Sequence, residues 1–390
     1  MTTAFLIIIC SLVIVAYLFD ISAAKTKIPS VILLLALGGL LKYTTILLDV
    51  QVPDLQQLLP LLGTVGLILI VLEGSLELEL SSARIGLVKR SVLSAFVPML
   101  VLAVILAAYV YFYTQGEIKN ILVNVLPLCV ISSAIAIPTV KNLSAEKREF
   151  IVYESSLSDI LGVLFFNFLA FNEVINGSTT LQFFLQLVLI VLVSVVATAF
   201  LAFLIGKIKH HVKFIPIISL MILIYAICKY YHLPSLLFIM VFGVVLNNIR
   251  ELKRWANVQS FSTEHLSQEV HRFKEIVTEG AFLIRIFFFI IFGFLIEPEE
   301  VINPDTLTLS LLTTLFIFVI RAVWLRVTKV DWIPLLFIAP RGLISILLFI
   351  SVPVGMQMNM INRSLLIQVV LLTALVMMMG MLIHKPNKNT

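Results

Sequence analysis

Charged residues are scarce in this sequence of 390 residues. Asp, Glu, Lys and Arg make up 13% of the chain, apolar residues make up 61%, and the mean hydropathy is +1.11. Soluble domains carry about 25% charged residues, so this chain has too little polar surface to be one. The composition predicts an all-α polytopic membrane protein, because helices satisfy their own backbone hydrogen bonds within lipid. The net charge of +5 is attributed to loops, and no nucleic-acid partner is expected.

Cysteine is also scarce. Cys10, Cys129 and Cys228 lie in or beside apolar stretches without paired spacing, which argues against a disulfide framework or a cysteine metal centre. No cofactor is expected. Met1–Thr3 contains no Lys or Arg, so the first apolar stretch is interpreted as a membrane span and not as a signal peptide. Only seven residues follow Ile383, and we therefore expect no soluble regulatory domain.

Apolar residues gather in thirteen segments, several of them shorter than the roughly 20 residues that a straight crossing prefers. These are Ala4–Phe19, Ile28–Leu41, Leu58–Leu72, Val92–Phe112, Ile121–Val140, Tyr153–Phe171, Leu181–Ile205, Ile215–Cys228, Leu233–Leu246, Ala281–Ile296, Leu307–Leu325, Ile333–Ile350 and Leu365–Ile383. With thirteen spans, one set of alternate loops and chain ends holds 20 Lys and Arg residues, and the other set holds Lys42, Lys119, Lys229 and Arg363. Basic loops face the cytoplasm, so we predict thirteen helices with the N-terminus outside and the C-terminus in the cytoplasm.

Two of the thirteen segments contain residues that interrupt helices. Segment five holds Pro127, Ser132, Ser133 and Pro138, and segment twelve holds the run Ala339–Gly342. Proline removes a helical hydrogen bond, and irregular backbone is tolerated in a membrane only where it lines a cavity or is buried in protein. Segments five and twelve cross in opposite directions, because they are an odd number of spans apart. Broken helices in matching positions predict an inverted repeat with a binding site where the breaks meet.

One acid, Asp159, lies inside the sixth segment. If this crossing begins near Ile151, Asp159 is about 12 Å into the bilayer, at ~1.5 Å per residue. A carboxylate at that depth costs about 3 kcal/mol, so it is retained mainly where it meets a partner, a cavity or a transported ion. Ser155 and Gly162 share its helix face. Carboxylate and hydroxyl oxygens beside a broken helix form a hard oxygen site suited to a small cation or a proton.

Three arginines fall inside apolar segments. We interpret Arg321 as lying near a helix end and snorkelling to the interface. Arg285 and Arg341 lie deeper, and the sequence leaves open whether each has a structural pairing or a functional role. The hydrophilic stretch 247–280 carries apolar residues at helical spacing and predicts a linker helix along the cytoplasmic interface.

Several motifs resemble the monovalent cation/proton antiporter superfamily, in its sodium/proton exchanger branch. The run from Glu154 to Asp159 resembles the family motif Glu-Ser-Leu-Leu-Asn-Asp, with Ser158 in place of the Asn. Leu72–Leu78 is similar to the acidic end of the family's third helix, Phe287–Gly293 to its aromatic helix, and Pro340–Leu343 to its second broken helix. The family's Thr-Asp-Pro in the first broken helix reads Ser-Ser-Ala here, which replaces an acid by Ser133.

The resemblance implies a role for each matching position. Asp159 would bind a monovalent cation and a proton in alternation, and Ser155, Glu73 and Ser132 would complete the shell of the cation. Glu154 would form an ion pair with Arg285 that joins two core helices.

Arg341 would stabilise the crossing of the broken helices, and Ser133 would stand there as a neutral group in place of the family's acid.

We therefore expect electroneutral 1:1 exchange of Na⁺, or K⁺ or Li⁺, for H⁺ by alternating access in a transporter that is not an enzyme. The expected core is residues 92–171 and 307–383, and the expected scaffold and dimerisation unit is residues 4–72 and 181–296. A homodimer in the plasma membrane, which is the inner membrane in bacteria, with a role in pH homeostasis, is implied. The alternatives are a sodium-coupled symporter of a small organic anion and, less favoured, a gated cation channel.

Overall fold

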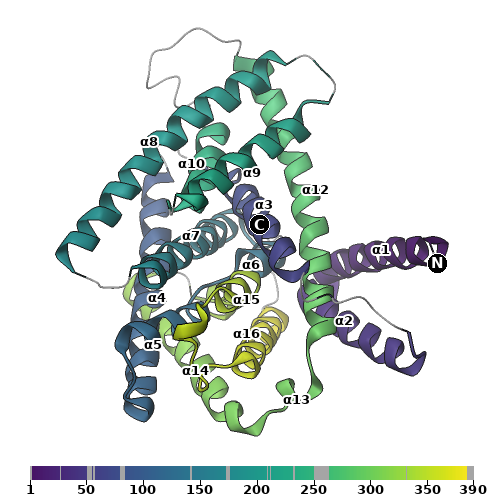
Figure 1. Ribbon diagram of the computed structural model, residues 1–390, viewed down its shortest axis with the longest axis vertical. Coiled ribbons are helices and arrows are strands. Elements are labelled where there is room, and N and C mark those ends of the chain that lie inside the picture. The colour runs from purple at the N-terminus through teal and green to yellow at the C-terminus, as the bar shows by residue number, and fades with distance from the viewer. Residues whose placement is uncertain are drawn as a thin grey trace.

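The computed structural model describes residues 2–26, 28–50, 55, 58–79, 84–140, 143–172, 176–208, 210, 212–231, 233–249, 263–330 and 332–383. Helices account for nearly all of the regular structure in these residues, and no strand occurs among them (Figure 1). In chain order, the long helices of the first half are α1 (Thr2–Thr26), α2 (Ser30–Leu47), α3 (Leu58–Ser75), α4 (Ile85–Thr114), α7 (Ala145–Phe171) and α8 (Gly177–Lys207). Those of the second half are α9 (Phe214–Tyr230), α10 (Ser235–Asn247), α12 (Thr263–Leu295), α14 (Pro304–Val327) and α16 (Arg363–Ile383).

Each of the thirteen predicted segments coincides with a helix or with an interrupted helix. Ten stretches of the described chain are long and apolar enough to cross a membrane, and one of these ten is the interrupted helix 118–139. Helices α9 and α10 are apolar but shorter, and the second interrupted helix completes the set. The predicted fold class, an all-α polytopic membrane protein with an inverted repeat and two broken helices, is confirmed.

The two interruptions lie where the prolines predicted them. The first interrupted helix consists of α5 (Ile118–Val125), the 3₁₀ turn η2 (Leu126–Leu128) and α6 (Ser133–Thr139). The second consists of the 3₁₀ turn η3 (Leu335–Phe337) and α15 (Leu343–Ile350). Between the two parts of each, the backbone leaves the helix, at residues 129–132 and 338–342. Ser132 N–H donates to the carbonyl of Pro340 at 2.9 Å, so the two interruptions are hydrogen-bonded to each other.

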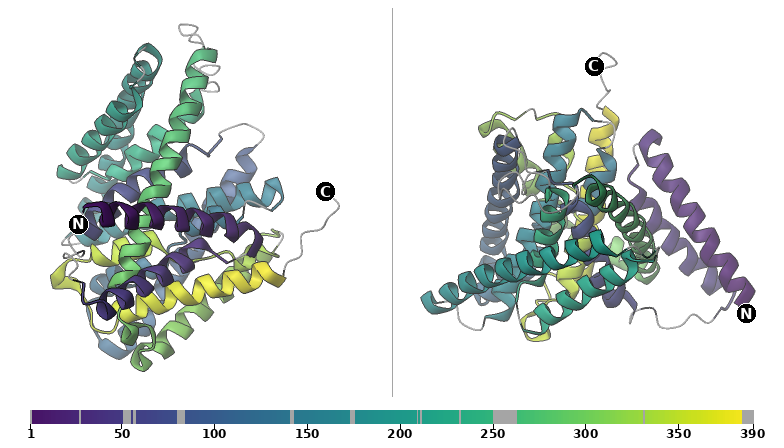
Figure 2. Two further views of the ribbon diagram at one scale, coloured as in Figure 1. Left: turned by 90° about the vertical axis from the view of Figure 1, so that its right-hand side faces the viewer. Right: turned by 90° about the horizontal axis from the view of Figure 1, so that it is seen from above.

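Helix α7 lies at the centre of the bundle. Figure 1 shows it beside α6 and near α15, while α8 and α1 lie at the edges, and both views in Figure 2 also place α1 on the outside. Apolar and small residues surround α7 on every side, and it is buried from Phe150 to Ser156 and again at Ser158 and Asp159. A helix that is buried all round holds its polar groups away from water and lipid alike.

The expected linker helix differs from the observed structure. Residues 263–280 are not a separate interfacial helix but the first half of the continuous 33-residue helix α12. Val270, Phe273 and Val277 form the predicted apolar stripe and are buried, with Phe273 against the rings of Phe214 and Phe242. Residues 250–262 of the expected linker lie outside the described residues.

Helices α2 and α12 approach each other so closely that only glycine fits at their crossing. A Cβ atom at Gly38 would overlap the carbonyl oxygen of Ile290 and lie 2.6 Å from the backbone nitrogen of Phe294. Backbone atoms cannot rotate away as side chains do. At neighbouring Gly39, a Cβ would lie 4.0 Å from the carbonyl of Gly293, an ordinary van der Waals distance.

We predict that Gly38→Ala destabilises the protein by about 1–3 kcal/mol, the cost of overpacking a close contact. Gly39→Ala is the matched control, and it should leave stability within about 0.5 kcal/mol or raise it, because alanine favours a helix. Unfolding in mixed micelles with increasing sodium dodecyl sulfate measures both variants. Equal effects at the two positions would contradict the close approach at Gly38.

Candidate functional site

Asp159 lies in the middle of α7, beside the first interruption. Its side chain is 1% exposed, and its Oδ2 accepts hydrogen bonds from the backbone N–H of Ser133, at 3.2 Å, and from the Ser133 hydroxyl. The other carboxylate oxygen, Oδ1, has no hydrogen-bond partner among the described residues. Ser133 is the first residue of α6, so the carboxylate lies at the positive end of that half-helix. One oxygen is therefore fixed by the protein, and the other is left to bind something else.

The extended residues before α6 are fixed one after another. Ile131 N–H donates to the hydroxyl of Ser158 at 2.9 Å, Ser132 N–H donates to Pro340, and Ser133 N–H donates to Asp159. Three consecutive N–H groups thus bind a serine of α7, the other interruption and the buried acid. Ser158, which stands where the resembling family has Asn, provides the first of these bonds.

Two further predicted residues lie close by in the fold. Ser132 is fully buried, and its hydroxyl has no partner among the described residues. A Cβ added at Gly342 would lie 2.9 Å from that hydroxyl, so the second interruption approaches Ser132 at its glycine. Ser155 lies one turn before Asp159 on α7, and its hydroxyl donates to the carbonyl of Ile151 at 2.7 Å. Both hydroxyls keep lone pairs that can face a cation.

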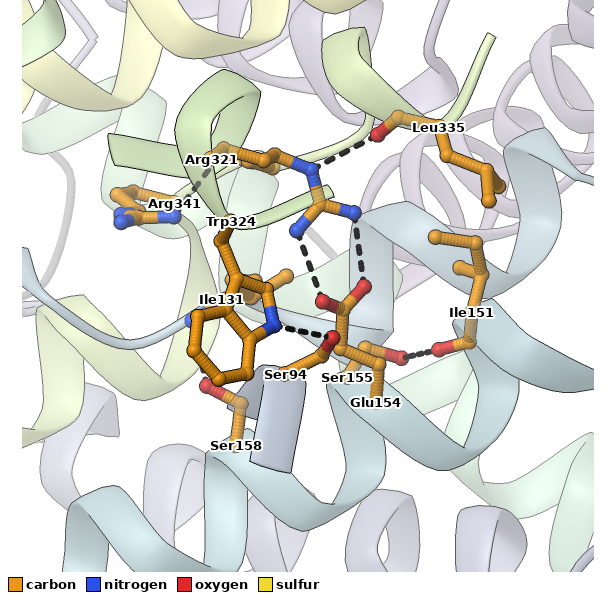
Figure 3. A network of polar contacts seen from close by, with 11 residues as sticks. Ser94, Ile131, Ile151, Glu154, Ser155, Ser158, Arg321, Trp324, Leu335 and Arg341 are labelled. Atoms are coloured by element: carbon orange, nitrogen blue, oxygen red, sulfur yellow. Dashed lines mark hydrogen bonds and ion pairs between the residues drawn. The ribbon is translucent and has the colours of Figure 1, made fainter. Parts of the chain in front are cut away.

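Glu154 pairs with Arg321, and the predicted pair of Glu154 with Arg285 is wrong. Figure 3 shows the two parallel bonds, from Nη1 to Oε1 at 2.9 Å and from Nη2 to Oε2 at 2.7 Å. Arg321 is 3% exposed, so the interpretation that it snorkels to an interface is also wrong. Its Nε donates to the carbonyl of Leu335 at the second interruption. The pair therefore joins α7 to α14, and Arg321 also holds the 3₁₀ turn η3 that precedes the second interruption.

Arg285 and Glu73 line a different part of the structure. Arg285 Nη1 donates to the carbonyl of Ala134 in α6 at 3.2 Å. Both residues line a cavity of about 280 Å³, which is also bounded by Asp20, Glu77, Glu279 and Ser133. Ser133 joins this cavity to the buried acid, because it lines the cavity and donates to Asp159. The structure thus places Glu73 on an approach to Asp159 and shows no direct contact between the two acids.

Arg341 lies in the second interruption, and backbone carbonyls surround its guanidinium. Nε donates to Leu128 at 2.9 Å, Nη1 to Ala339 at 2.9 Å and Nη2 to Cys129 at 3.4 Å. Leu128 and Cys129 end the first half-helix, where the helix dipole carries partial negative charge. The backbone N–H of Arg341 donates to the hydroxyl of Thr373 on α16. The arginine therefore compensates a half-helix end and holds the two interruptions together.

Asp159 differs in its pairing from the other buried acids among the described residues. Glu154 binds Arg321, and Glu269 binds Lys213 at 2.7 Å. Among the described residues, Asp159 has no basic partner and receives only the two hydrogen bonds of Ser133. A buried carboxylate without a base is stable when it holds a proton or a cation, since an isolated buried charge is costly.

Sequence reasoning missed two contacts that shape this site. One feature of the sequence indicates that Arg321 is buried. It lies more than a full helical turn before Arg326, which stands at the end of the helix, so Arg321 is too deep to reach the interface easily. The bond from Ile131 N–H to Ser158 had no signal, because it joins a backbone group to a residue 27 positions away.

A buried acid where two interrupted helices meet inside a membrane bundle defines a class of secondary transporters. A family model described as sodium/hydrogen exchanger, transmembrane, matches residues 9–386. The chain belongs to the sodium/hydrogen exchanger family. A search of curated protein sequences finds no significant match.

Solved structures share this fold. The sodium proton antiporter MjNhaP1 from Methanocaldococcus jannaschii, in a structure at pH 8, has a TM-score of 0.73 and 16% identity over 97% of this chain and 99% of that chain. An electron-microscopy map of the same antiporter gives a TM-score of 0.71 and 16% identity, covering 99% of this chain and 100% of that chain. At this identity, the likeness establishes the fold.

We predict that Arg321→Met destabilises the protein by about 3–5 kcal/mol, because it leaves Glu154 buried without its partner. Arg285→Met is the matched control, and it should cost less, at most about 1.5–3 kcal/mol, the value of one hydrogen bond that involves a charged group. Unfolding in mixed micelles compares the two. A larger loss of unfolding free energy for Arg285→Met than for Arg321→Met would instead support a pairing of Glu154 with Arg285.

Proposed function

We propose that this protein exchanges a monovalent cation, Na⁺ in the first place, for H⁺ across the membrane by alternating access. The observation that carries the proposal is the state of Asp159, which is buried at the meeting of the two interruptions and which, in the part of the chain that the structure describes, has no basic partner and one unpartnered oxygen. Cation and proton then compete for the same carboxylate. Binding of either one offsets the cost of the buried charge.

The oxygen groups around Asp159 support a small, hard cation. The hydroxyl of Ser132, which has no partner among the described residues, lies in the first interruption, and the hydroxyl of Ser155 lies one turn before Asp159 on α7. Hard cations bind oxygen ligands, including hydroxyls and backbone carbonyls. In this proposal Asp159 Oδ1 supplies the charge, and Ser132 and Ser155 supply neutral ligands. Glu73 acts on the approach path.

The acid-lined cavity supports a route to this site. Among the described residues that line the cavity, the acids Asp20, Glu73, Glu77 and Glu279 outnumber the bases, of which Arg285 is the one described, so the potential in the cavity favours cations. Ser133 forms the inner boundary between cavity and carboxylate. We assign this cavity to the cytoplasmic side, because the basic loops place the end of α3 there.

The charge distribution supports 1:1 exchange. Glu154 is neutralised by Arg321, so its charge stays constant during transport. Asp159 alone changes its occupant in this proposal, and one carboxylate holds either one monovalent cation or one proton. The loaded carrier then has the same charge in both directions of movement, and exchange is electroneutral.

Family membership favours exchange over the alternatives of sodium-coupled symport and channel conduction. We further propose that the protein works as a homodimer in the plasma membrane with its N-terminus outside. In this arrangement the core, residues 92–171 and 307–383, moves against the scaffold, residues 4–72 and 181–296. Exchange of this kind serves pH homeostasis.

We predict that Asp159→Asn abolishes exchange while the protein stays folded, because the amide oxygen can still accept from Ser133. Dequenching of an entrapped pH dye in proteoliposomes, on addition of Na⁺, K⁺ or Li⁺ in turn, measures the activity. Asp305→Asn, an exposed acid at the start of α14, is the control and should leave exchange within about twofold, as expected for an exposed surface position. Exchange that survives in Asp159→Asn would exclude this acid as the transport site.

We also predict that the rate of Na⁺/H⁺ exchange does not change when a potassium diffusion potential is imposed across the liposomes. A carrier that moves one net charge gains about 2.3 kcal/mol per 100 mV, which would change its rate visibly. Liposomes with and without valinomycin provide the comparison. A rate that follows the voltage would rule out 1:1 exchange and leave the assignment of Asp159 intact.

A further inference from the structure

A second, smaller cavity shares no lining residue with the acid-lined one. Its volume is about 20 Å³, and α4, α14 and both interruptions enclose it. The polar side chains that line it are Ser94, Cys129, Arg321 and Arg341, and apolar side chains such as Met99 and Leu102 complete its walls. One water molecule needs about 10–15 Å³ of such space, so the cavity has room for one particle somewhat larger than a water molecule.

Arg321 and Arg341 each have more N–H donors than acceptors that those donors contact. A guanidinium has five N–H groups and no acceptor atom. Arg321 uses three of these groups on Glu154 and Leu335, and Arg341 uses three on the carbonyls at the interruptions. Each guanidinium therefore retains donors without an acceptor among the described residues, and both line this cavity.

Ser94 adds a further donor. Its hydroxyl oxygen accepts from Trp324 Nε1 at 2.7 Å, and within the described residues its hydrogen has no acceptor. The side chain is buried, and Figure 3 shows it in the same network as the two arginines. Cys129 offers no acceptor of comparable strength, since its thiol donates to Val125. The polar side chains around the cavity are thus mainly donors.

The charged groups around the cavity also favour a ligand that accepts hydrogen bonds. Glu154 neutralises Arg321, whereas among the described residues the guanidinium of Arg341 binds only carbonyls, so its positive charge has no acidic partner there. Asp159 does not line this cavity and, in the proposed cycle, is itself neutralised by a proton or a cation. A buried positive charge favours an anion close to it.

We propose that this cavity binds one small monovalent anion of the halide class, which chloride would supply in the cell. A halide accepts several hydrogen bonds at once and tolerates apolar walls, which matches two guanidiniums and a hydroxyl beside Met99 and Leu102. The cavity is too small for a phosphate or an organic acid. The anion would fix the relative position of α4, α14 and the two interruptions, and it is neither exchanged nor needed to balance the transported charge. The proposal does not depend on the exchange activity, because binding is measured directly.

Bromide identifies the site in the intact protein. Crystals grown or soaked in NaBr should show an anomalous peak between Arg321, Arg341 and Ser94. Ordered water without an anomalous signal at this position would overturn the proposal.

Thermal unfolding gives an independent measurement. At constant Na⁺ concentration, replacing gluconate by chloride or bromide should raise the unfolding midpoint by a few degrees, in a saturable way. Ala95→Val fills the cavity that Ala95 lines, and it should abolish this halide effect. Ala103→Val, at a buried position of the same helix that does not line the cavity, is the matched control and should retain it. A halide effect that persists in Ala95→Val would place the anion elsewhere and refute the assignment.

Discussion

Backbone polar groups inside a membrane must find partners within the protein, and two interrupted helices leave many of them free. This structure satisfies them with few side chains. The side chains of Ser158 and Asp159 accept from the N–H groups of residues 131 and 133, and the backbone carbonyl of Pro340 accepts from the N–H between them. Arg341 donates to carbonyls where the first half-helix ends, and Arg321 donates to the carbonyl of Leu335 in η3. The side chains that permit the interruptions are therefore the same ones that surround the candidate transport site.

Asp159 also satisfies a backbone N–H group of an interrupted helix, a role that its position in the sequence does not indicate. It caps the half-helix α6 through Ser133, at the place where the resembling family has a second acid. One carboxylate thus supplies the negative charge at that half-helix end and the charge for the ion. The remaining charges are held apart from it, because Glu154 is bound by Arg321 and Arg341 by carbonyls. When a cation replaces a proton on Asp159, or the reverse, the other charged side chains of the site keep their partners.

Pairing inside the bundle shows where reasoning from the sequence reached its limit. Glu154 and three arginines were all assigned to apolar segments, and depth along the helix was the only quantity that spacing provided. Depth does not give the direction in which a helix presents a side chain to its neighbours. Arg285 on α12 meets the carbonyl of Ala134, whereas Arg321 on α14 meets the carboxylate. The linker helix shows the same limit, because its apolar stripe was correct and its continuity with α12 depends on packing against α9 and α10.

The sequence by itself determined the membrane class, the thirteen segments, the two interruptions and the central acid. These follow from local physics: apolar length sets the spans, proline and glycine set the breaks, and the cost of a buried charge singles out Asp159. The tertiary structure alone decided which arginine meets Glu154, that Ser133 binds Asp159, and that two arginines and Ser94 share one small cavity. Those contacts join residues tens to hundreds of positions apart, and their geometry depends on how the helices rotate and approach, which no local pattern encodes.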